Sequence, residues 1–168
     1  MSRQFCARPL NCTTTFGTLT IGGLSLHGPA WCAFDLSPLT DSPEFRDSNI
    51  LVESLPGRAA RPTVVDQTDY SLRMMLSGYS NQAGVPWSNP AGGLLANKLK
   101  LIEELVEPIQ QGTSSLAGVL TVPHPESGNI VYTFDCQPLR ITVSTPRSSP
   151  YARGVLELRV PVPELATT

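Results

Sequence analysis

The sequence predicts a mainly β protein, built as an antiparallel β-sandwich or barrel with one flanking α-helix. Short segments in which apolar and polar residues alternate recur along the chain, separated by turns rich in Gly and Pro, as is typical of half-buried strands. Only residues 94–106 have the spacing of an amphipathic helix. A parallel βαβ architecture is excluded because it requires a helix after nearly every strand.

The length and composition fit one domain. The chain has 168 residues, enough to bury a sizeable core. Its 16 prolines and 13 glycines suit short strands joined by many turns. Residues 1–16 are Thr-rich and have no clear period, which predicts an N-terminal arm. Residues 17–168 are predicted to form a single β-rich domain with a helix at about residues 93–107.

The strand candidates are defined by apolar residues at alternating positions. In residues 17–26 the apolar positions change parity after Gly22-Gly23, which predicts a bulge or a tight hairpin. In residues 70–76 every second side chain is apolar, from Tyr70 to Leu76, as in a strand with one buried face. The other strand candidates are residues 31–36, 50–55, 116–122, 130–136, 139–143 and 156–162.

The predicted helix must pack against the sheet, because so short a helix is marginal alone. Asn89-Pro90 lies at a plausible helix start. Pro108 is expected to end the helix, since it lacks an N–H and clashes with the preceding turn. The apolar stripe is formed by Leu95, Leu99, Ile102 and Val106, and it is widened by Leu94, Leu101 and Leu105.

Charge and cysteine content exclude several classes of function. The net charge of −2 offers no basic excess for nucleic-acid binding, and no run of 18 apolar residues predicts a transmembrane helix. No secretory signal is recognised, so the product is expected in the cytosol unless it leaves within a particle. Disulfides are rare there, and no Cys pair has C-x-x-C spacing, so free thiols and no metal are expected. Cys32 and Cys136 lie in apolar stretches and are expected in the core.

No motif for catalysis or cofactor binding is present. The sequence lacks a P-loop, a G-x-S-x-G elbow and an H-E-x-x-H pair. His27 and His124 are each followed closely by a proline at a strand end, which predicts solvated turn histidines. We therefore expect no enzyme activity and no cofactor.

A set of charged loop residues is a candidate subunit interface. It comprises Arg46, Arg58, Arg61, Asp66 and Arg73. These are either ordinary solvated loop charges or a contact surface, where Arg is enriched because it fixes geometry between partners. Trp87, in a loop rich in Gly, Ser, Asn and Pro, is either a lid over the core or an exposed interface anchor.

The order of elements across residues 55–107 resembles a known family. Leu55-Pro56-Gly57-Arg58, then the segment 69–78 (DYSLRMMLSG), a loop, and the helix 94–107 are similar to the amino-terminal domain of distal tail proteins of long-tailed bacteriophages, and more loosely to tail-tube-like minor tail proteins. The resemblance covers about residues 17–163. Distal tail proteins usually carry a second, galectin-like domain, for which this chain is too short.

The resemblance implies a structural virion protein, assembled in the host cytoplasm and located in the tail. Such a protein would form a ring, hexameric by resemblance, at the tail tip and connect the tail tube to the tip complex. Its implied partners are copies of itself, the tail tube protein, and tip, hub and other minor tail proteins, with DNA only as passing cargo. The alternatives are another tail protein (tube, terminator or adaptor) and a non-catalytic carbohydrate-binding β-sandwich module. An aromatic content of 7% disfavours the carbohydrate-binding module.

Overall fold

The computed structural model describes residues 10, 12, 17–40, 45–46, 64–65, 68–144, 149–160 and 166–167. The strand candidate at residues 50–55 and most of the predicted loop at residues 58–68 lie outside these ranges.

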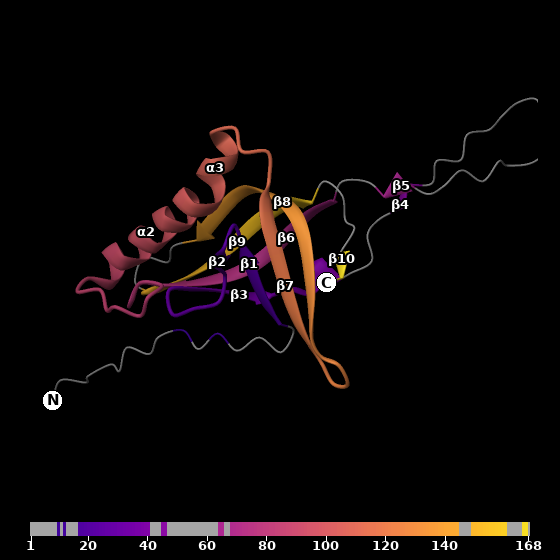
Figure 1. The fold of residues 1–168 in the computed structure, drawn as a ribbon. Coiled ribbons are helices and arrows are strands. Elements are labelled where there is room, and N and C mark those ends of the chain that lie inside the picture. The colour runs from indigo at the N-terminus through magenta and orange to yellow at the C-terminus, as the bar shows by residue number, and fades with distance from the viewer. Residues whose placement is uncertain are drawn as a thin grey trace, which may run out of the picture.

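The described strands confirm a mainly β, antiparallel fold. Seven of them form one sheet in the order β2-β1-β7-β8-β9-β6-β3, which curls into a half-barrel (Figure 1). The sandwich or barrel of the prediction is thus realised as a single curled sheet. The strands are β1 (Thr18–Ile21), β2 (Leu24–Ser25), β3 (Trp31–Asp35), β6 (Thr68–Ser77), β7 (Leu116–His124), β8 (Gly128–Ser144) and β9 (Tyr151–Val160); β10 (Ala166–Thr167) also pairs with β8, while β4 (Phe45–Arg46) and β5 (Val64–Val65) pair with each other.

Strand β8 joins the two halves of the curl. Residues 130–136 and 139–143, predicted as separate strands, belong to this one strand. Its first part pairs with β7 and its second part with β9. The register shifts between Pro138 and Arg140, where a proline without an N–H interrupts the ladder. Such an irregularity bends a strand and lets one sheet wrap around a core.

The paired glycines after β1 form the predicted tight hairpin. Gly22 and Gly23 have φ angles of 58° and 80°, and Ile21 pairs directly with Leu24. A two-residue loop with both φ angles positive is the turn that best matches the twist of antiparallel strands. The change of parity in the sequence therefore marks the reversal of the chain.

A single apolar core fills the inside of the curl. Every second residue of β6 from Leu72 to Leu76 is fully buried, as predicted, and so are inward side chains of β1, β7 and β9. Trp31 is a core residue, as expected, with its indole N–H donating to the Ser25 carbonyl at 3.1 Å. Burial of such side chains stabilises the fold by about 1.5–3 kcal/mol each.

The helix packs on this core with most of the apolar residues that were predicted to face it. It consists of α2 (Pro90–Leu101), the π-helical turn η1 (Ile102–Val106) and α3 (Glu107–Gln110), and it runs alongside the curled sheet (Figure 1). The prediction is wrong for Leu95 and Leu99, which are 57% and 56% exposed. It is confirmed for four buried residues, and the buried face also carries Asn97; the four are Leu94, Leu101, Leu105 and Val106.

The two ends of the helix differ in how well they were predicted. Asn89 caps the start, its side-chain oxygen accepting from the N–H groups of Ala91 and Gly92, as Asn-Pro predicts. Pro108 does not end the helix, which continues to Gln110. The Glu107 N–H bonds to the Ile102 carbonyl, one residue further back than in an α-helix. This wider turn gives the proline ring room beside the carbonyl it would otherwise meet.

Asn97 and two glycines fix the helix to the end of β6. The Asn97 side chain is buried and donates to the carbonyls of Ser77, at 2.7 Å, and Ser80, at 2.8 Å. A Cβ on Gly78 would collide with the Pro90 carbonyl, and one on Gly93 would collide with the Gly78 carbonyl and the Trp87 ring. The backbones of the loop and the helix therefore meet directly.

The cysteines and histidines partly contradict the sequence-based expectation. Free thiols were predicted, but a disulfide joins Cys12 to Cys32. Cys136 is a free thiol in the core, and burial raises its pKa to about 12. His124 is an exposed turn histidine, as predicted, whose Nδ1 accepts from two backbone N–H groups. His27 is half-buried, which overturns its prediction as a solvated residue.

Candidate functional site: a groove on the outer face of the sheet

A surface hollow lies on the outer face of β6 and β9. In both strands, inward residues fill the core and the residues between them face outward. The register places Arg73 opposite Val155 and Met75 opposite Arg153. Directly opposed residues on one face of a sheet have neighbouring side chains. The strand pairing therefore brings two arginines and two apolar side chains together.

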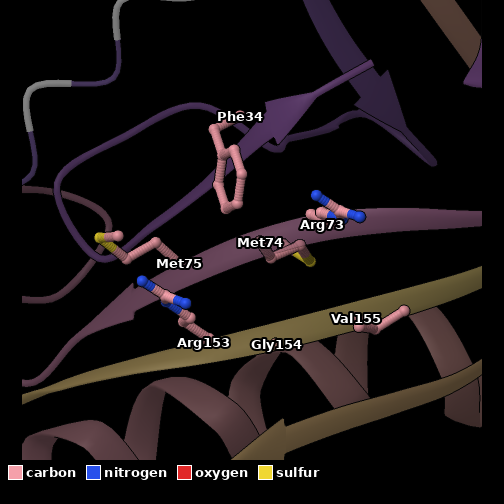
Figure 2. A pocket seen from close by; sticks show the side chains of 7 residues that line it. All are labelled: Phe34, Arg73, Met74, Met75, Arg153, Gly154 and Val155. Carbon is pink, nitrogen blue, oxygen red and sulfur yellow. The ribbon is translucent and has the colours of Figure 1, made fainter. Parts of the chain in front are cut away.

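Phe34 of β3 completes this surface because of an irregularity in the ladder. Ala33 pairs with Met74 and Asp35 pairs with Arg73, so Phe34 is the extra residue of a bulge. A bulge redirects a side chain that strict alternation would place elsewhere. Phe34 is 44% exposed. Figure 2 shows its ring reaching over β6, with Arg73 on one side and Met75 and Arg153 on the other.

These side chains line a shallow groove, which we call the outer groove. Its main part has a volume of about 490 Å³ and is lined by Phe34, Arg73, Met74, Met75, Arg153, Gly154 and Val155. A second hollow of about 370 Å³ shares Met75 and Arg153 with it and extends to Tyr151 and Ser144. Both are open to the surface, so the outer groove can receive a side chain or loop of another molecule.

The outer groove carries positive charge that is only partly compensated. On the same face, Arg159 bonds Asp69 at 2.8 Å and Arg140 bonds Glu157 at 2.7 Å. Arg73 and Arg153 form no salt bridge within the described part of the chain.

Asp35 is a carboxylate that interacts electrostatically with Arg73 of the outer groove. A hydrogen bond from the Ser37 hydroxyl, at 2.6 Å, lowers the pKa of Asp35, and the charge of Arg73 lowers it further. Asp35 is therefore ionised at neutral pH. Among the described residues, the Asp35 carboxylate is hydrogen-bonded to Ser37 and not to Arg73, so Arg73 keeps donors for a further anion.

The described lining residues suit the binding of another molecule. Among them are two arginines, two methionines and a phenylalanine, and no histidine, cysteine or carboxylate. Two guanidinium groups beside apolar and aromatic surface suit a carboxylate next to an apolar side chain. Arg, Met and Phe are also enriched where proteins meet.

The predicted interface residues separate into three groups. Arg73 lies in the outer groove. Trp87 is 39% exposed and packs against Gly93 at the start of the helix, away from the groove-lining residues. Arg46 belongs to β4, whereas Arg58, Arg61 and Asp66 lie outside the described residues. Of the members of this set that the structure describes, Arg73 alone lines the outer groove.

Two groove residues were missed in the sequence. Alternation in β9 places Arg153 outward, on the same side as Glu157 and Arg159, so that signal was present. Phe34 lies in an apolar run that predicts burial, and no local sequence pattern predicts the bulge that exposes its side chain.

A second apolar surface lies on the helix. Leu95 and Leu99 are one turn apart and more than half exposed. Such a pair on an otherwise amphipathic helix is a candidate contact with a partner.

No described helix is long and apolar enough to span a membrane.

A comparison with protein-family models finds no match, and a comparison with curated proteins finds no similar sequence. The fold and the described surfaces are therefore the basis on which function must be inferred.

Proposed function

We propose that the protein is a structural component of a phage tail, which assembles as a ring at the tail tip and connects the tail tube to the tip complex. The observation that carries the proposal is the single antiparallel sheet, curled into a half-barrel and covered by one helix. The resemblance of residues 55–58, 69–78 and 94–107 to distal tail proteins implied a β-domain of this plan, so the fold supports the proposal without depending on any catalytic residue.

The outer groove supplies one of the two surfaces that a ring requires. In a ring each subunit uses two different patches, one of which fits the other on the next copy. The groove presents Arg73 and Arg153 around Phe34 and Met75, a combination typical of interface centres. Its complement is an acidic and apolar segment of the neighbouring copy, of the tail tube protein or of a tip protein.

The overall charge is consistent with a channel through which DNA passes. The chain carries a net charge of −2. A surface without basic excess does not retain a phosphate backbone by counterion release. DNA would therefore be cargo rather than a ligand.

The proposal is tested by the size of the purified protein and by its presence in particles. Light scattering after size-exclusion chromatography should show an oligomer, and negative-stain images should show rings. Antibody labelling should locate the protein at the tail tip of purified virions. A strict monomer at high concentration, together with absence from virions, would overturn the proposal.

A pair of charge reversals tests the role of the outer groove. The double variant Arg73→Glu, Arg153→Glu should lose the oligomer while keeping its circular dichroism spectrum, because like charges would then face the partner's acidic surface. Arg140→Glu is the matched control, since Arg140 lies on the same face outside the groove. Equal disruption by both changes would refute a groove-specific contact.

A further inference from the structure

A second cluster of reactive side chains lies apart from the outer groove. Cys12, His27 and Cys32 each offer one ligand atom, and these atoms all lie within 4.8 Å of one another. Cys32 belongs to β3, and His27 pairs with it across the tight turn that leads into this strand. Cys12 precedes β1 in the chain. Folding, rather than a local motif, therefore assembles two sulfurs and one imidazole.

The His27 ring is poorly satisfied when the two cysteines form a disulfide. Its Nδ1 lies 3.2 Å from the Cys12 sulfur, which in a disulfide has no proton and accepts only weakly. Its Nε2 is buried and has no hydrogen-bond partner among the described residues. The nearby Ser25 hydroxyl bonds only the backbone of His27. A half-buried imidazole in this state lacks the partners that such groups normally have.

We propose that, when the disulfide is reduced, Cys12 Sγ, Cys32 Sγ and His27 Nδ1 bind one Zn²⁺ ion. Zinc takes sulfur at about 2.3 Å and imidazole nitrogen at about 2.0–2.1 Å in a tetrahedron. A tetrahedral zinc therefore holds its two sulfur ligands about 3.8 Å apart and each sulfur about 3.5 Å from the imidazole nitrogen. The distance of 3.2 Å between Cys12 Sγ and His27 Nδ1 is close to this, whereas the two sulfurs, which are bonded to each other in the disulfide, move apart once it is reduced. Two thiolates and one imidazole form a ligand set that zinc prefers. Water occupies the fourth position.

The site then alternates between a Zn²⁺ complex in the reduced protein and the Cys12–Cys32 disulfide in the oxidised protein. Reduction by a small thiol breaks the sulfur–sulfur bond, adding two electrons and two protons to the cysteines, and the thiol is oxidised to its own disulfide. Zinc binding releases the two cysteine protons. In the reverse direction, a small-molecule disulfide takes two electrons from the thiolates and two protons from solvent, becoming two thiols. The Cys12–Cys32 bond re-forms and Zn²⁺ leaves.

Both states join the same two segments of the chain. The disulfide links Cys12 to β3 across 20 residues, and the metal would link them through the same atoms. The cluster thus keeps Cys12 attached to β3 under reducing and oxidising conditions alike.

The test uses Co²⁺ as a spectroscopic probe of the reduced full-length chain, followed by displacement with Zn²⁺. One Co²⁺ per chain should bind and give the near-ultraviolet band of thiolate-to-cobalt charge transfer, and Zn²⁺ should abolish it. Cys12→Ser and Cys32→Ser should each weaken binding at least about 100-fold, since loss of even an outer partner commonly costs 10–100-fold. His27→Gln should weaken binding at least about tenfold and leave the charge-transfer band.

Cys136→Ser is the matched control, because Cys136 is buried away from the cluster, and it should bind as the wild type does. Circular dichroism of each reduced variant shows whether it is folded. Alkylation gives an independent readout in the unmutated protein: Zn²⁺ should protect two thiols, identified as Cys12 and Cys32 by mass spectrometry. Cobalt binding without a thiolate band, or equal alkylation of these cysteines with and without Zn²⁺, would overturn the proposal.

Discussion

The buried Asn97 offers a sharp test of how the helix is held. Its side-chain amide donates to two carbonyls, those of Ser77 and Ser80, in a position that is 2% exposed. Replacing it by leucine keeps the number and branching of heavy atoms, with somewhat larger methyl groups, and removes both donors. The variant Asn97→Leu should therefore report mainly the free energy contributed by these two hydrogen bonds.

The expected size of the effect follows from the two carbonyls that lose this donor. A buried polar group left without its partner costs about 1–3 kcal/mol, so two give roughly 2–6 kcal/mol. The added apolar burial of leucine offsets about 1–2 kcal/mol of this. At the middle of these ranges the net loss is about 2.5 kcal/mol, which lowers the melting temperature of a domain of this size by roughly 5–10 °C.

Urea denaturation followed by circular dichroism measures the free energy of unfolding directly. Leu95→Ala is the matched control on the same helix, because Leu95 is 57% exposed and should change stability by no more than about 0.5 kcal/mol. If Asn97→Leu costs as little as this control, then the two hydrogen bonds do not hold the helix, and the reasoning fails.

Three further predictions concern the turn, the helix contact and the ion pair of the sheet. Gly22→Asn should raise the melting temperature by a few degrees, because Asn accepts a φ of 58° and restricts the unfolded chain; a lower value would contradict this. Gly93→Ala should lower the free energy of unfolding, measured by urea denaturation, by more than about 2 kcal/mol, since the added Cβ meets the Gly78 carbonyl and the Trp87 ring. Gly84→Ala is the control: its Cβ would meet no atom, so it should show only the smaller cost of its positive φ. The Arg159 guanidinium lowers the pKa of Asp69 by hydrogen bonding. This pair therefore stabilises the folded protein above the unfolded carboxyl pKa of about 3.9, and the stabilisation is lost as pH falls through the lower folded pKa. The difference in unfolding free energy between the wild type and Asp69→Asn should shrink in acid, and a wider difference there would refute the prediction.

The sequence was most informative where the periodicity had one interpretation. The alternation of residues 70–76 and the parity change at Gly22-Gly23 predict features that the structure contains. On the helix, the predicted apolar stripe was right for Leu101 and Leu105 but wrong for Leu95 and Leu99. Asn97 is polar and yet buried, because the carbonyls of Ser77, at the end of β6, and Ser80, in the loop after it, accept its hydrogen bonds. Only the tertiary fold reveals such partners.

The candidate site was predictable only in part, for a similar reason. Arg73 was identified as an interface residue by its charge and position. Phe34 was not, because a bulge between paired strands determines its direction. The cluster of Cys12, His27 and Cys32 has no sequence spacing typical of a metal site. Its members meet because the turn before β3 pairs His27 with Cys32 and because the disulfide joins Cys12 to Cys32.

The strand order also determines when the protein can fold during its synthesis. Strands β7, β8 and β9 follow one another in the chain and pair in sequence, so they close short loops at small entropic cost. By contrast, β1 pairs with β7 and β6 pairs with β9, and both partners belong to the last third of the chain. On the ribosome, β1 can pair early with β2 and β3 with β6, but the other edges of β1 and β6 stay unpaired until β7 and β9 have been synthesised.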